Sequence, residues 1–141
     1  MKAKPSIYGE SLVVSGKRKT AIAKASIKPG SGIIRINRFN VETFPYLRRI
    51  YIQEPLLIAK SILGKIDFDI SVRVKGSGPE AQAEAARLAI AKSVIAYKKS
   101  AELKKAFLNY DRNMLIADVR RKEQRKPGDS KARACKQWSR R

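Results

Sequence analysis

Residues 68–97 read FDISVRVKGSGPEAQAEAARLAIAKSVIAY, and this stretch decides the fold. Apolar and polar side chains alternate over 68–75, which is the period of a strand with one buried face. A helix is then predicted over 79–97, begun either by a capping box at Ser77 or by Gly78 as the cap with proline in the first helical position. Its apolar residues recur every three or four positions and include many alanines, so we expect close packing on a neighbouring surface.

The strands predicted upstream suggest what that surface is. Residues 20–28 alternate in the same way as 68–75 and predict a second strand. The sequence 29–32, Pro-Gly-Ser-Gly, is typical of a turn. It leads to a short apolar strand over 33–36, which we expect to return on the second strand as a hairpin.

Further helices are expected on both sides of the 68–97 unit. One fits residues 55–63, entered by proline and closed by Gly64, and another fits 101–110 with Ser100 as its cap. Residues 43–52 fit either a helix or a loop. The inward residues of the 101–110 helix are expected to be Leu103, Phe107 and Tyr110. Together these elements predict an α+β fold, a two-layer sandwich of a mostly antiparallel or mixed sheet backed by helices.

The charge of the chain points to its class of partner. Thirty-two Lys and Arg residues face twelve Asp and Glu residues in 141, so the formal net charge is +20 and the sequence pI is near 10.5. Hydrophobic residues make up 43%, which is enough for a packed core. So large a surplus of cations destabilises a compact chain unless a polyanion neutralises it. Nucleic acid is the first candidate partner, and an anionic membrane surface is the second.

Several classes of protein are excluded by what the sequence lacks. It has no His, the commonest general base and metal ligand, and Cys135 is its one cysteine. We therefore expect no enzyme activity, metal, cofactor or small-molecule substrate. No apolar run approaches the 18 residues of a membrane span, and no secretory signal is evident. The expected protein is soluble and lies in a reducing compartment.

The composition changes near residue 119. Residues 119–141 hold ten Lys or Arg against two acids, a net charge of +8, with few apolar residues. Such a segment cannot offset its own ordering entropy, so we expect an extended basic tail that orders only on RNA. The chain is accordingly divided into an amino-terminal extension (1–11), a globular domain (12–118) and the tail (119–141).

Two short motifs could bind phosphate. Gly76-Ser77-Gly78 joins a strand to a helix and would serve a tight turn, an RNA phosphate or, less simply, a nucleotide in a small phosphotransferase. The loop lacks the G-K-[ST] ending of a P-loop. Lys17-Arg18-Lys19 directly precedes the strand predicted over 20–28, and these cations are either solvated or in contact with a phosphate backbone.

Four motifs in order resemble the universal small-subunit ribosomal protein nine family, in its archaeal and eukaryotic branch. They are GKRKTA (16–21), VRVKGSG with QAEAAR (72–87), YDRNML with DVRRKE (110–123), and KPG with ARA (126–134). The resemblance covers about residues 12–141. Ser77 stands where that family has a central glycine, and Arg140 where a tyrosine is usual.

The resemblance implies a fold with a left-handed β-α-β crossover and a place in the head of the small subunit, in the cytoplasm. Implied partners are small-subunit rRNA, neighbouring head proteins and, through Arg140 and Arg141, the anticodon stem-loop of the P-site tRNA. The residues expected to bind rRNA are Lys17, Arg18, Lys19, Gly76, Ser77, Gly78, Arg112, Arg120, Arg121, Lys122, Lys126, Lys131, Arg133 and Lys136. The alternative is a free-standing RNA-binding or RNA-chaperone module.

Overall fold

The computed structural model describes residues 7–8 and 11–135. Its strands are β1 (Ile7–Tyr8), β2 (Ser11–Arg18), β3 (Ala21–Pro29), β4 (Ile34–Ile36), β5 (Phe39–Asn40) and β6 (Phe68–Lys75). Its helices are α1 (Tyr46–Leu63), α2 (Pro79–Lys98) and α3 (Ala101–Tyr110), with two 3₁₀ turns, η1 (Val41–Thr43) and η2 (Arg112–Met114).

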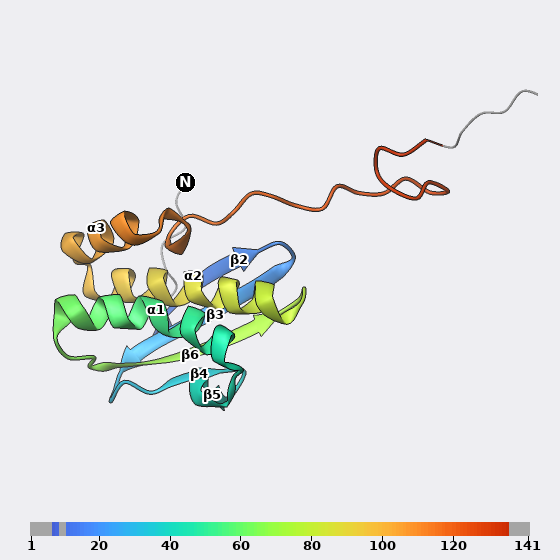
Figure 1. Cartoon of the computed structure of the whole chain (residues 1–141). Coiled ribbons are helices and arrows are strands. Elements are labelled where there is room, and N and C mark those ends of the chain that lie inside the picture. The colour runs from blue at the N-terminus through green and yellow to red at the C-terminus, as the bar shows by residue number, and fades with distance from the viewer. Residues whose placement is uncertain (1–6, 9–10, 136–141) are drawn as a thin grey trace, which may run out of the picture.

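The strands form one mixed sheet in the order β1-β2-β3-β6-β4-β5. All neighbouring strands are antiparallel except β4 and β6, which are parallel and are joined through α1. Helices α1 and α2 lie together on one side of the sheet, and α3 packs beside them (Figure 1). The predicted α+β class, with a mixed sheet backed by helices, is confirmed. The handedness of the β4-α1-β6 crossover stays a prediction.

The hairpin predicted between the strands over 20–28 and 33–36 is wrong. Strand β6 lies between β3 and β4, so the segment 33–36 pairs with β6 and β5 and not with β3. The side chain of Asp69 on β6 explains the difference, because its Oδ1 accepts hydrogen bonds at 2.9–3.0 Å from the backbone amides of Ser31, Gly32 and Ile33. These bonds direct the turn after β3 onto β6.

Helix α2 is the predicted helix after β6, and it packs very closely on the sheet. Gly78 is its cap and proline occupies the first helical position, which selects the second of the two predicted starts. A Cβ on Gly16 of β2 would lie 2.4 Å from the carbonyl oxygen of Ala85 and 2.7 Å from the amide nitrogen of Ala89. The alanines of α2 and this glycine therefore let the helix backbone approach the β2 backbone.

Helix α1 is longer than predicted. It begins at Tyr46, so most of the ambiguous segment 43–52 is helical, and the expected start at Pro55 is wrong. Pro55 lies inside the helix, where it removes one backbone hydrogen bond. It is buried in a row with Ile52 and Leu56, and this apolar packing compensates for the missing bond. Gly64 closes the helix at φ +72°, as predicted.

Helix α3 confirms its predicted cap but only part of its predicted core. The Ser100 hydroxyl accepts a hydrogen bond from the Leu103 amide at 3.4 Å, and Leu103 and Phe107 are fully buried. Tyr110, which was expected to face inward, is 59% exposed. Met114 of η2 joins the core beside Phe107 in its place, because the chain turns sharply after α3.

Beyond η2 the chain has no helix or strand as far as residue 135. Figure 1 shows this segment leading away from the body. In the described part of the chain, none of the helices has the length and apolar character needed to cross a membrane.

Replacing Gly16 with alanine is expected to destabilise the fold by about 1–3 kcal/mol, because the added methyl group would collide with two backbone atoms of α2. Urea denaturation measures this as a lower free energy of unfolding. The matched control is Gly78→Ser, since Gly78 has open space around its Cα and serine is a good helix cap. Equal stability of the Gly16→Ala protein and the wild type would contradict the close approach.

Candidate nucleic-acid interface

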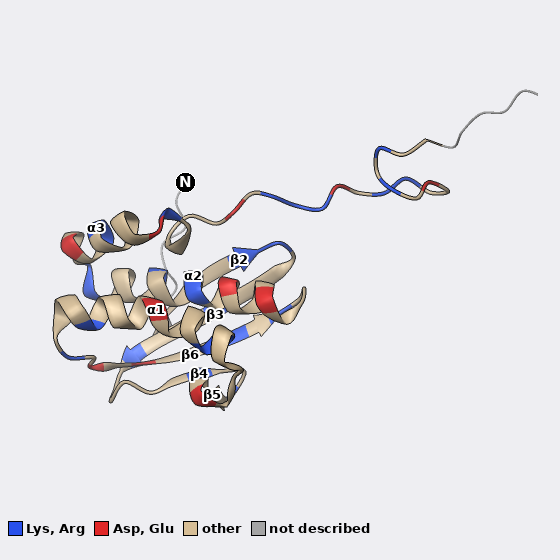
Figure 2. Cartoon of the chain, viewed as in Figure 1, with Lys and Arg blue, Asp and Glu red and all other residues tan. Residues whose placement is uncertain are grey.

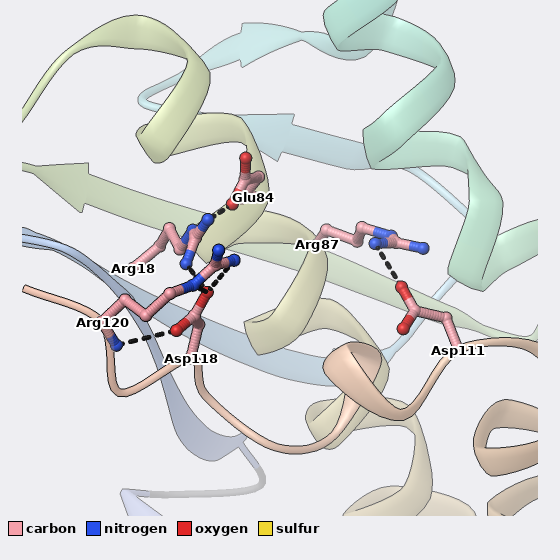
Figure 3. A network of polar contacts seen from close by, with 6 residues as sticks. All are labelled: Arg18, Glu84, Arg87, Asp111, Asp118 and Arg120. Atoms are coloured by element: carbon pink, nitrogen blue, oxygen red, sulfur yellow. Dashed lines mark hydrogen bonds and ion pairs between the residues drawn. The ribbon is translucent and has the colours of Figure 1, made fainter.

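An ion-pair network joins the start of the basic segment, the tail that begins at residue 119, to the body, residues 12–118. The Arg18 side chain, at the end of β2, contacts Glu84 on α2 and Asp118 after η2. Arg120 binds the same Asp118 carboxylate, with its Nε 2.8 Å and its Nη2 2.7 Å from Oδ2. The Arg120 backbone amide also donates to Asp118 Oδ1 at 2.8 Å. Figure 3 shows the four side chains converging from three parts of the chain.

A second network lies deeper between the helices. Arg87 of α2 donates through Nη1 to Asp111 Oδ2 at 2.9 Å, and its Nε pairs with Glu54 Oε2 of α1 at 2.6 Å. Its guanidinium also lies over the ring of Tyr51, 5.9 Å from the ring centre, in a cation–π contact. Arg87 and Glu54 are both more than four-fifths buried. This network ties α1, α2 and the entry to η2 together, so it positions the chain that leads into the basic segment.

The carboxylate of Asp118 stays ionised at neutral pH, so the first network keeps its charges. Hydrogen bonds from the Arg120 side chain and backbone, followed by that from Arg18, hold the pKa of Asp118 well below its usual range. The pKa of Arg120 is raised in turn, chiefly by its hydrogen bond to Asp118. Both groups therefore stay charged at neutral pH, and residues 118–120 remain bound to the hairpin formed by β2 and β3.

The network brings three predicted motifs together around one groove. Arg18 and Lys19 of the hairpin, Ser77 of the strand-to-helix turn and residues 120–122 line a cavity of about 620 Å³. The Arg121 guanidinium donates to the backbone carbonyl of Lys19, which holds the segment against the hairpin turn. Four of the lining side chains other than Arg18 are cationic: Lys19, Arg120, Arg121 and Lys122. A groove with this lining favours a phosphate group.

The 76–78 turn has a structural reason for its first glycine. Gly76 has φ +86°, and a Cβ there would lie 2.5 Å from the Thr20 carbonyl oxygen in the β2–β3 turn. The side-chain Nε2 of Gln82 also donates to the Gly76 carbonyl at 3.1 Å. The glycine thus lets the two turns approach each other. The described residues contain no group of acidic or sulfur side chains that could hold a metal ion.

The other predicted residues are spread along the surface. Lys17 and Arg112 are exposed. Lys17-Arg18-Lys19 come just before β3, as predicted, and they also form the end of β2 and the turn after it, a strand that was not predicted. Lys126, Lys131 and Arg133 are exposed on the irregular segment, where Figure 2 shows cations following one another with few acids. Of these, Arg133 pairs with Glu123 at 3.0 Å. The predicted sites at Lys136, Arg140 and Arg141 lie outside the described residues.

Arg18 differs from the other cations predicted to bind RNA. Its side chain is only 18% exposed and pairs with two carboxylates, so it positions the residues of the groove. Sequence reasoning missed Glu84 and Asp118 as its partners. The spacing of Asp118 and Arg120, two residues apart in a charged segment, was the one local signal available.

Comparison with known proteins identifies relatives along almost the whole chain. The family described as Ribosomal protein S9/S16 matches residues 16–141. Proteins named small ribosomal subunit protein uS9 match from three archaea. The one from Thermoplasma acidophilum is 45% identical over 129 residues, covering 91% of this chain and 98% of the relative. Those from Pyrobaculum aerophilum and Methanococcus vannielii are 44% and 46% identical, covering 86% and 82% of this chain and 85% of each relative.

Replacing Asp118 with alanine is expected to release the start of the basic segment, because Arg18 and Arg120 lose the carboxylate that they share. Hydrogen exchange at the Arg120 amide should become several-fold faster at pH 7. In the wild type the pKa of Asp118 is lower in the folded than in the unfolded chain, where it is about 3.9. Protection of this amide should therefore be complete above that pH and disappear as the pH falls through the depressed pKa.

The matched control is Glu123→Ala, which removes a carboxylate of the same segment from an exposed pair with Arg133. It should leave the Arg120 amide protected. Unchanged exchange at Arg120 in the Asp118→Ala protein would show that the carboxylate does not anchor the segment.

Proposed function

We propose, on the premise that this chain belongs to the ribosomal protein S9/S16 family, that it binds the rRNA of the small-subunit head through its body and its basic segment. The chain is a structural constituent of the small ribosomal subunit, in the cytoplasm, and takes part in translation. It is not an enzyme, so that expectation is confirmed by its family and the phosphotransferase alternative falls.

The observation that carries the proposal is the reach of the family match. It extends from Gly16 to the end of the chain and so includes the whole segment with ten Lys and Arg residues. The like charges of a segment this basic repel one another unless a polyanion neutralises them. Ribosomal RNA is the polyanion that a constituent of the small subunit meets.

The proposed mechanism is electrostatic. Exposed cations of the hairpin turn, the groove and the basic segment displace the counterions condensed on RNA and fix RNA helices beside one another. Little base reading is expected, since the major groove of paired RNA is too narrow for side chains. In this view the body (12–118) is an anchor and the tail (119–141) orders along RNA.

The finer part of the proposal concerns tRNA. We assign Arg140 and Arg141 to the anticodon stem-loop of the P-site tRNA and the other predicted cations to rRNA. What supports this is the family resemblance, since the terminal arginine is kept at Arg141. Neighbouring proteins of the subunit head complete the proposed set of partners.

Deleting residues 119–141 should lower the salt dependence of RNA binding. If the tail contacts on the order of eight phosphates, the log–log slope of affinity against salt falls by roughly six when the tail is removed. The measurement is the affinity of the full chain and of residues 1–118 for a small-subunit head transcript across a salt series. Circular dichroism checks that residues 1–118 keep their fold, and an unchanged slope would refute the role of the tail.

Removing Arg140 and Arg141 should weaken tRNA binding at the P site by about 1–3 kcal/mol and leave subunit assembly intact, because charge-assisted contacts to the tRNA backbone are lost. Filter binding of tRNA to purified subunits gives the affinity, and sedimentation in a sucrose gradient reports assembly. Lys104→Gln with Lys105→Gln removes the same charge from the surface of α3 as a control. An assembly defect with normal tRNA retention would place the two arginines on rRNA instead.

A further inference from the structure

The face of the sheet that the helices leave uncovered is lined by cations. In β3 the residues Ala21, Ala23, Ala25 and Ile27 are fully buried toward the helices, so the alternate residues lie on the other face. The strand register extends this face across four strands. We call it the open face, and its residues are Val13, Ser15, Lys17, Ile22, Lys24, Ser26, Lys28, Arg35, Asp69, Ser71, Arg73 and Lys75.

The open face carries six cations and one acid. That acid, Asp69, is engaged by three backbone amides, which keep its pKa low, the Ile33 amide having the largest effect. Within the described residues, none of the six cations forms an ion pair. The helical side differs, because Arg18, Arg48, Arg87 and Lys98 are all paired there with carboxylates. The internal acids thus pair with several cations on the helical side, whereas the cations of the open face have no such partner in the described part of the chain.

Some of these cations are placed against one another. Lys24 of β3 lies directly opposite Arg73 of β6, and Ile22 separates Lys17 from Lys75 in the next row. Neighbouring strands are about 4.8 Å apart, and like charges at opposed positions destabilise a sheet. This repulsion is an unfavourable term in the free chain, and an anion placed over the rows would remove it.

The rest of the open face indicates which kind of polyanion fits. Ser26 lies opposite Ser71, and the two line a hollow of about 380 Å³ together with Lys28 and Arg35. Serine hydroxyls can bond to phosphate oxygens or to the 2′-hydroxyl of ribose. On β2, β3, β6 and β4, the residues that the register places on this face include no aromatic ring on which an unpaired base could stack. The lining therefore favours a sugar–phosphate backbone over splayed bases.

We infer that the open face is a second RNA-binding surface, which grips the backbone of paired RNA independently of the basic segment. Lys24, Arg73 and Lys75 contact phosphates, and the serines between the cations contact phosphate or ribose oxygens. This inference rests on the proposed function for its RNA partner. It adds a surface whose residues, apart from Lys17, were not among the predicted binding sites.

The test compares two triple variants of the full chain. The first is Lys24→Gln, Arg73→Gln and Lys75→Gln on the open face, and the control is Lys60→Gln, Lys104→Gln and Lys105→Gln, three exposed cations on α1 and α3. Both remove three charges. The probe is an RNA hairpin stem of about 20 base pairs, which is long enough to span the sheet. Its affinity is measured across a salt series. The open-face variant should lower the log–log slope by about two to three, and the control by less than one.

A second measurement uses the wild-type chain, so it does not depend on the variants folding. Chemical acetylation of lysines with and without the hairpin stem should show protection at Lys24, Lys28 and Lys75, and little protection at Lys60, Lys104 and Lys105. Oligouridine of the same length should protect the open-face lysines less, since it offers no paired backbone. Equal protection by both RNAs, or equal slopes for the two triple variants, would overturn the inference.

The outcomes also separate this inference from the proposed function. If deleting the tail lowers the slope and the open-face variant does not, RNA binding stands and the open face has no part in it. If neither change affects binding to RNA, the proposed function itself fails.

Discussion

Twelve carboxylates have to serve thirty-two cations, and the positions of those carboxylates decide which cations remain available. Asp118 holds Arg18 and Arg120, Glu54 and Asp111 hold Arg87, and Asp67 holds Lys98. These pairs connect α2 with α1 and the segment before β6, and they connect β2 with the chain that leads into the basic segment. The acids therefore stabilise the junctions of the fold, and the sheet surface and the segment beyond residue 120 keep their positive charge.

Close packing of the backbone makes those junctions possible. Gly16 lets β2 approach α2, and Gly76 lets the turn before α2 approach the turn after β2. The same approach brings Arg18 within reach of both Glu84 and Asp118. A larger side chain at either glycine would separate the elements that carry the charges, so the glycines support the interface although neither needs to bind RNA.

The resulting molecule combines a rigid body with a segment that has little internal support. The body has a core of apolar side chains between the sheet and the helices. Residues 121–135, all of them described, are mostly exposed and contain one ion pair, between Glu123 and Arg133. Ordering such a segment costs conformational entropy that its own contacts cannot repay. In the proposed function, binding along rRNA supplies the free energy that orders this segment.

Local pattern was enough to predict the parts of this protein whose structure depends on near neighbours. The alternation in β3 and β6, the proline start of α2, the Ser100 cap of α3 and the surplus of cations are all properties of short stretches, and they were predicted correctly. The partner of β4, the start of α1 and the engagement of Arg18 were not. The partner of β4 and the engagement of Arg18 depend on groups far away in the chain: Asp69 lies 36 residues beyond Ile33, and Asp118 lies 100 residues beyond Arg18. Periodicity carries no record of such contacts, so only the tertiary structure decided which strand β4 joins and which cations face outward.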